Sequence, residues 1–166
     1  MSKQDIIVNY YKKQSVFYDF TRPLFLFGRN EIIKLISNKK PKGKLLEIGC
    51  GTGYLLHKLS DKTELELTGI DLSAEMLTMA KKKLGNDIVL FHSDLMDYDS
   101  AIKYDYIILS YVFTLDLANA LVHIDKVKSL LKPNGRIYVV DFQCFFIDFS
   151  IVFWQLPKIS IFIKML

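Results

Sequence analysis

The sequence contains few of the residues that support metal binding, redox chemistry or disulfide bonds. Among its 166 residues are two cysteines and three histidines. Cys50 and Cys144 do not form a disulfide framework, and the histidines lie far apart without the spacing of metal ligands. We therefore expect no metal site and no disulfide bond.

Long apolar runs are also absent, although hydrophobic residues make up 51% of the chain. No stretch reaches the roughly 18 consecutive apolar residues of a membrane-spanning helix. The N-terminal residues mix charged and polar side chains with apolar ones, unlike a signal peptide. The composition therefore predicts a cytoplasmic protein, and the length predicts one domain over residues 1–166.

Positive charge is in modest excess, with a formal net charge of +4. Lysines gather in residues 39–44 and 81–83, where they can attract anionic lipid or nucleic acid. A solvated surface explains both clusters more simply. Because basic strands with interleaved aromatic residues are missing, we expect no nucleic-acid partner.

Gly49, Gly51 and Gly53 form an alternating glycine motif directly after the apolar segment 45–48. Glycine permits positive φ angles and lets a ligand approach the main chain. The apolar positions of residues 54–59 are spaced for one face of a helix. The pattern therefore predicts a strand, a ligand-binding loop and a helix. It lacks the Gly-Lys-Ser/Thr of a phosphate-binding loop, and a dinucleotide motif needs glycine where Tyr54 stands.

Asp71 ends the next apolar segment, residues 65–70. In nucleoside-binding doubly wound folds, a carboxylate about 20 residues beyond the glycines accepts hydrogen bonds from the ribose. The alternative is that Asp71 helps to cap a helix that begins near Ser73. Together with the glycine loop, its position favours the ribose role.

Five segments resemble the class I S-adenosylmethionine-dependent methyltransferases, in the order of that family: residues 47–53, 69–77, 92–94, 104–110 and 130–137. The resemblance extends over about residues 10–142. It implies an α/β fold with a Rossmann-like doubly wound sheet in strand order 3-2-1-4-5. It also implies S-adenosyl-L-methionine as cofactor and S-adenosyl-L-homocysteine as product.

Site residues are carried over from the family only at matching positions. Asp94 would accept a hydrogen bond from the adenine amino group, the alternative being a solvated loop acid. Tyr18 would face the sulfonium by a cation–π contact, with core packing an equal alternative. No catalytic side chain is expected, because the sulfonium methyl group is already activated. The implied cofactor-binding residues are Glu47, Gly49, Cys50, Gly51, Gly53, Asp71, Leu72, Met76, Asp94, Leu95, Ser110 and Tyr18.

Strand and helix patterns alternate through the region 44–142, as a parallel sheet requires. We expect the core to follow an N-terminal helical lid at 1–38 and to precede an apolar tail at 143–166. Strands are predicted near 44–49, 65–70, 87–91, 104–110 and 135–141, and helices near 53–60, 73–84 and 116–131. The lid is predicted to hold one helix over 3–18 and another that begins at Pro23.

The tail is the main departure from the family, whose members continue with an antiparallel hairpin at the sheet edge. Residues 143–166 are too few for that arrangement, so we expect a shortened or truncated chain with an incomplete edge. Apolar residues from Phe145 to Leu156 recur at helical spacing and predict one helix. It would lie on the sheet edge, against a second subunit, or at a membrane interface.

The substrate is less clearly marked. Ser110, Tyr111 and Val112 stand where methyltransferases of DNA bases carry Asn/Asp-Pro-Pro-Tyr, which argues against a base as acceptor. Residues 17–29, 110–111 and 139–142 resemble bacterial betaine-lipid head-group N-methyltransferases. We therefore expect methyl transfer to a small molecule or a lipid amine, with peripheral membrane contact and a homodimer as accompanying expectations. The alternative is a non-catalytic S-adenosylmethionine-binding or partner subunit.

Overall fold

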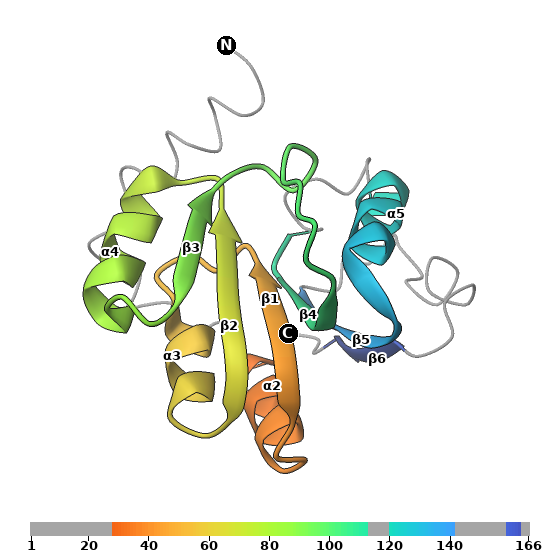
Figure 1. Ribbon diagram of the computed structural model, residues 1–166, viewed down its shortest axis with the longest axis horizontal. Coiled ribbons are helices and arrows are strands. Elements are labelled where there is room, and N and C mark those ends of the chain that lie inside the picture. Colours follow the sequence, from red (N-terminus) through yellow and green to blue (C-terminus); the bar gives the residue numbers. More distant parts are fainter. Residues whose placement is uncertain (1–27, 113–119, 142–158, 164–166) are drawn as a thin grey trace.

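The computed structural model of the protein describes residues 28–112, 120–141 and 159–163 (Figure 1). Tyr18, the first predicted lid helix, the start of the predicted 116–131 helix and the predicted tail helix lie outside these residues. The described strands form one six-stranded sheet in the order β3-β2-β1-β4-β5-β6, and every pair is parallel. The predicted order 3-2-1-4-5 is confirmed.

The elements follow the predicted alternation closely. The strands are β1 Lys42–Ile48, β2 Glu64–Asp71, β3 Val89–His92, β4 Tyr104–Ser110, β5 Leu131–Asp141 and β6 Ile159–Ile163. The helices are α2 Gly28–Ser37, α3 Tyr54–Ser60, α4 Ala74–Leu84 and α5 Ala120–Leu130. The glycine motif therefore joins β1 to α3, as its sequence predicts.

β1 lies at the centre of the described sheet, paired with β2 on one side and β4 on the other. Its last four residues are all buried, because helices and loops cover both faces of a parallel sheet. Leu45 packs in the cluster that holds the apolar residues of α2 and α3, whereas Leu46 packs in the cluster that includes Ile124 of α5. Successive side chains thus fill two cores, one on each face.

β5 begins earlier than predicted, at Leu131 rather than near residue 135. Tyr104 pairs with Leu131, and Tyr106 pairs with Arg136, so residues 132–135 form an irregularity opposite a single residue of β4. Pro133, Asn134 and Gly135, residue types that favour turns, are therefore built into the strand as a bulge. Proline has no N–H to give to the ladder and is confined to such positions.

β6 was not predicted. It pairs with the last five residues of β5, from Ile137 with Ile159 to Asp141 with Ile163. β6 belongs to the predicted apolar tail, so the tail lies on the edge of β5, one of the three positions expected for it, and does so as a parallel strand. The apolar repeat of residues 145–156 favoured a helix in the tail. The five residues of β6 are too few to show the alternation of apolar and polar side chains that marks a strand.

The described residues were also compared with the requirements of a membrane-spanning helix and of a metal site. Within the described residues, no helix is both long and apolar enough to cross a membrane. The same residues contain no group of three or more histidine, cysteine or acidic side chains that is arranged to hold a metal ion.

Candidate cofactor site

The glycine loop is fixed to the neighbouring strand by backbone hydrogen bonds. The N–H groups of Gly49 and Cys50 both donate to the carbonyl oxygen of Ile70, each at 3.0 Å. Gly49, Gly51 and Gly53 have φ angles of 73°, 54° and 73°. An L-residue with a side chain pays about 1 to 2 kcal/mol for this left-handed conformation, so the motif needs glycine for its backbone shape.

The three glycines differ in what surrounds them. A Cβ atom on Gly49 would lie 3.0 Å from the carbonyl oxygen of Ser110, and one on Gly53 would lie 2.7 Å from Leu84 Cδ1. A Cβ atom on Gly51 would have no heavy atom of the described residues within 4 Å. The outer glycines therefore allow close packing, while the middle one presents bare main chain to open space, where a ligand can approach.

Asp71 holds the loop in this shape. Its Oδ2 accepts a 2.7 Å hydrogen bond from the N–H of Gly51, and its Oδ1 accepts one of 2.9 Å from the N–H of Ser73. The N-cap of α4 is Ser73 itself, which accepts from the N–H of Met76. Asp71 thus joins the loop to the start of α4. Since each carboxylate oxygen accepts more than one hydrogen bond, it can also receive ribose hydroxyls.

Glu47 is fully buried near the end of β1. Its Oε1 accepts a 2.8 Å hydrogen bond from the Ser110 hydroxyl, whereas its Oε2 has no partner among the described residues. Burial raises the pKa of the Glu47 carboxyl to about 7, against the opposing effects of the Arg29 charge and the Ser110 hydrogen bond. A buried, half-satisfied carboxylate at the edge of the loop is suited to a ligand cation.

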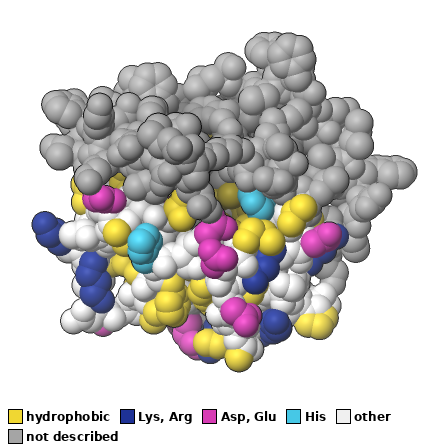
Figure 2. All heavy atoms as spheres, turned by 90° about the horizontal axis from the view of Figure 1, so that it is seen from above, with side chains coloured by type: hydrophobic (Ala, Val, Ile, Leu, Met, Phe, Trp, Pro, Cys, Tyr) yellow, Lys and Arg dark blue, Asp and Glu magenta, His cyan; other side chains and the backbone are white. Residues whose placement is uncertain are grey.

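The ends of β2 and β3 are also joined. The N–H of Ser93 donates to the carbonyl oxygen of Asp71 at 3.1 Å, and His92 Nε2 lies 2.9 Å from the carbonyl oxygen of Leu72. Asp94 is partly buried, and its Oδ1 accepts from the N–H of Met96 at 2.8 Å. Asp71, Leu72 and Asp94 therefore lie together at the carboxyl ends of β2 and β3. From above, this end of the molecule shows acidic and histidine side chains beside hydrophobic ones (Figure 2).

Three predicted site residues turn their side chains into the protein. Cys50, Met76 and Leu95 are 1%, 1% and 6% exposed. Leu95 packs in the cluster of Ile48, and Cys50 packs in that of Leu56. Burial raises the pKa of the Cys50 thiol well above its usual value, so it is a packed thiol and no nucleophile. Their part in cofactor binding stays a prediction.

Arg29, in the first turn of α2, is a candidate residue that the sequence motifs did not reveal. It is only 8% exposed, and its guanidinium carbon lies 5.6 Å from the centroid of the Tyr111 ring. Its charge lowers the pKa values of Glu47, Cys50 and Asp71. One feature of the sequence could have identified it. Arg29 lies on the buried apolar face of α2, with Ile32, Ile33 and Ile36, where a charged side chain is unusual.

Tyr111 has a φ of 57°, which is unusual for a residue other than glycine. Its N–H donates a 2.7 Å hydrogen bond to the carbonyl oxygen of Val140, which fixes the turn that follows β4. Strained backbone of this kind gathers at ligand sites. Here it places a buried aromatic ring directly after Ser110 and beside Arg29.

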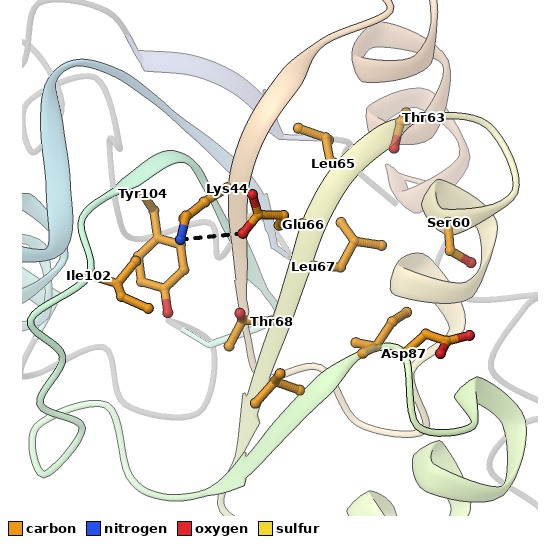
Figure 3. Close-up of a pocket in the computed structure, with 12 residues that line it drawn as sticks. Lys44, Ser60, Thr63, Leu65, Glu66, Leu67, Thr68, Asp87, Ile102 and Tyr104 are labelled. Atoms are coloured by element: carbon orange, nitrogen blue, oxygen red, sulfur yellow. Dashed lines mark ion pairs between the residues drawn. The ribbon is translucent and has the colours of Figure 1, made fainter.

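A separate cavity of about 450 Å³ lies at the opposite end of the strands (Figure 3). Its lining includes Lys44 and Glu66, which form an ion pair at 3.3 Å, as well as Ile102 and Tyr104. Ligands of open α/β sheets bind outside the carboxyl ends of the strands. This cavity lies at the start of β2, away from the glycine loop, so we assign it no part in the candidate site.

Comparison with known proteins identifies the family. A family model described as "Methyltransferase domain" matches residues 45–135, more than half of the chain. The chain belongs to this family. The match contains the glycine loop, Asp71, Asp94 and Ser110, and it confirms the general resemblance seen in the sequence.

Curated relatives of the methyltransferase domain match over part of their length. A malonyl-[acyl-carrier protein] O-methyltransferase of Priestia megaterium is 40% identical over 96 residues, which cover 56% of this chain and 34% of that protein. A demethylmenaquinone methyltransferase of Thermotoga maritima is 30% identical over 132 residues, covering 75% and 56%. The chain thus spans about a third of the first relative and just over half of the second. These relatives do not support the betaine-lipid subfamily.

Solved structures give the same fold. The complex of DhpI with S-adenosylhomocysteine has a TM-score of 0.67 at 23% identity, covering 78% of this chain and 64% of DhpI. The plantazolicin methyltransferase BpumL, in complex with a pentazolic desmethylPZN analogue and S-adenosylhomocysteine, has a TM-score of 0.65 at 26% identity, covering 82% and 55%. The methyltransferase domain of this chain therefore has the architecture of proteins that bind this nucleoside.

Proposed function

We propose that the protein binds S-adenosylmethionine and transfers its methyl group to a small-molecule acceptor, leaving S-adenosylhomocysteine. The observation that carries the proposal is the glycine loop: within the described part of the chain, its middle residue Gly51 faces open space, while Asp71 accepts a hydrogen bond from its N–H. Membership of the methyltransferase domain family and the bound product named for DhpI and BpumL support it.

The groups around the loop match the chemical parts of this cofactor. Asp71 offers acceptors to ribose hydroxyls, and the unpartnered Oε2 of Glu47 offers one to an ammonium group. The open main chain at Gly51 leaves room for the sulfur-containing chain of the cofactor. Both carboxylates lie at the carboxyl ends of neighbouring strands, where such ligands bind.

The bound cofactor would supply a methyl group that is activated by a positively charged sulfur. The residues of this chain would then align the acceptor with that group and exclude water, which accounts for much of the rate of such a reaction. Ser110 keeps Glu47 oriented toward the site. A general base is needed only where the acceptor carries a proton, and we assign that role to no described residue.

The acceptor is proposed from the relatives and from the sequence resemblance. The names of the relatives point to a malonyl thioester on a carrier protein and to demethylmenaquinone. A lipid amine is the second candidate, and the resemblance of residues 17–29 to betaine-lipid enzymes supports it. For that acceptor we propose peripheral contact of a cytoplasmic protein, or its homodimer, with the membrane.

Titration calorimetry of the full chain with S-adenosylmethionine, S-adenosylhomocysteine and NAD tests the proposal. We expect micromolar binding of both sulfur compounds and none of NAD. Formation of S-adenosylhomocysteine is then measured with a malonyl thioester, a demethylated quinone and a lipid amine in anionic vesicles. Failure to bind either sulfur compound contradicts the proposal, whereas binding without turnover on any acceptor favours the non-catalytic alternative.

A further inference from the structure

Arg29 is a buried cation that lacks a partner among the described residues for part of its guanidinium group. It is 8% exposed, and its Nε makes no hydrogen bond to any of those residues. None of the ion pairs formed among the described residues includes it. Burying a charge without a partner is costly, so such groups are usually paired. The exception at Arg29 therefore points to a ligand that completes its interactions.

The backbone on both sides of Arg29 is held in place. Gly28 packs against the side chain of Val140 at the end of β5, where a Cβ atom would not fit. Asn30 accepts a 3.2 Å hydrogen bond from the hydroxyl of Tyr54, the first residue of α3. The start of α2 thus lies beside the start of α3, directly after the glycine loop, and the Tyr111 ring supports the guanidinium.

The charge of Arg29 acts on the carboxylates of the candidate site. It favours the ionised forms of both Glu47 and Asp71, although it forms an ion pair with neither of them. Glu47 Oε2 and Arg29 Nε are therefore two buried groups of opposite charge, each with unused hydrogen-bonding capacity. An α-amino acid carries one ammonium and one carboxylate group, which match these two groups in charge and number.

We propose that Arg29 binds the carboxylate at the amino-acid end of the cofactor. This inference rests on the proposed function and adds to it a recognition residue in α2. A guanidinium group presents parallel N–H donors that match a carboxylate, which an ammonium group cannot reproduce. The first turn of α2 contributes the positive end of its helix dipole to the same carboxylate.

The experiment compares two ligands that differ only at the amino-acid end. S-adenosylhomocysteine carries it, whereas 5′-methylthioadenosine keeps the nucleoside and the thioether without it. Calorimetry is performed on the full chain and on Arg29→Met, Arg29→Lys and Lys34→Met. Lys34 is the matched control, because it lies in the same helix, carries the same charge and has a side chain that is 68% exposed.

Arg29→Met should weaken S-adenosylhomocysteine binding by about 10- to 100-fold, the effect of losing a hydrogen bond to a charged group. Arg29→Lys should weaken it less. Neither variant should change the affinity for 5′-methylthioadenosine, and Lys34→Met should change neither affinity. An equal change for both ligands, or no change for S-adenosylhomocysteine, would overturn the inference.

Two further outcomes keep this test separate from that of the proposed function. If the unmodified chain does not bind S-adenosylhomocysteine, the proposed function itself is wrong. If Arg29→Met fails to unfold cooperatively, Arg29→Lys supplies the comparison, and equal losses for the two ligands again count against Arg29. Thermal unfolding of the ligand-free variants monitors the fold throughout.

Discussion

The hydroxyl of Ser110, at the end of β4, donates a 2.8 Å hydrogen bond to Glu47 Oε1 on the neighbouring strand β1. The bond favours the ionised carboxylate against the effect of burial. It also directs the other oxygen of Glu47, which is unpartnered, away from Ser110. The two residues are 63 positions apart in the sequence, and the β1–β4 pairing brings them together.

Cofactor binding should therefore depend on pH with a midpoint near 7, the pKa of Glu47. Since the ionised carboxylate is the form that attracts a ligand ammonium group, affinity should rise as the pH rises through that value. Ser110→Ala removes a group that lowers the pKa, so it should shift the midpoint upward. Calorimetry with S-adenosylhomocysteine from about pH 6 to pH 8.5 measures both curves. Identical, flat curves would remove Glu47 from the binding site.

Glu47→Gln should stabilise the ligand-free protein at neutral and alkaline pH. The pKa of Glu47 rises from 4.5 to about 7 on folding, so the folded chain holds this proton more tightly than the unfolded chain. The free energy of unfolding then falls as the pH rises between those two values. The variant should recover on the order of 2 to 3 kcal/mol at pH 8 and little at pH 5. Urea unfolding at both pH values measures this.

The same substitution should weaken binding of S-adenosylhomocysteine, because a neutral amide lacks the charge that attracts an ammonium group. Burial also raises the pKa of Asp71, and this contribution to the pH dependence should remain in the variant. A Glu47→Gln protein that is less stable at pH 8 than the unmodified chain would show that Glu47 has a structural role instead. Stability and binding moving in opposite directions is the pattern expected of a functional site.

Gly51→Val should abolish binding of S-adenosylhomocysteine by filling the open space above the loop. Gly85→Val is the control, because Gly85 also has a positive φ, and a Cβ atom added there would have no described heavy atom within 4 Å. Gly85 is the C-cap of α4 and is not one of the three glycines of the loop. Gly51→Val should lose about 1 to 2 kcal/mol of stability. Gly85→Val should lose at least as much, because its φ of 69° and ψ of −144° lie close to a region that essentially only glycine adopts. Only Gly51→Val should lose binding. Equal affinities in calorimetry would contradict a ligand at Gly51.

Sequence and structure agree best where one local pattern has one physical cause. The alternating glycines from Gly49 to Gly53 predicted a loop with positive φ angles. Apolar segments predicted β1, β2 and β4, because parallel strands that are buried on both faces consist mainly of apolar residues. The sequence did not reveal Arg29 as a candidate, because its proposed role depends on tertiary interactions. These are its contact with the Tyr111 ring and the effect of its charge on the carboxyl group of Glu47. β6 was not predicted because its five residues are too few to show a period of their own.

Asp71→Ala should weaken S-adenosylhomocysteine binding by about 1.5 to 3 kcal/mol, the scale of hydrogen bonds to a charged group. The structure adds a cost to the fold, because Asp71 accepts from the N–H groups of both Gly51 and Ser73. Asp71→Asn should do less harm to both properties, since its amide oxygen can still accept. Calorimetry and urea unfolding separate the two effects. Normal binding by Asp71→Ala would show that the ribose role is wrong.

Removal of β6 should destabilise the protein and cause self-association. β6 supplies the backbone partners of Ile137–Asp141 in β5, and an unpaired strand edge is a template for pairing with a second chain. A chain that ends at residue 158 tests this, and a chain that ends at Ile163 is the control, because it keeps all of β6. The shorter chain should unfold at a lower urea concentration and elute as larger species in size-exclusion chromatography with light scattering. The control should match the full chain. If both truncated chains behave like the full chain, the pairing of β6 contributes nothing measurable to the sheet, and the edge of β5 is protected by other means.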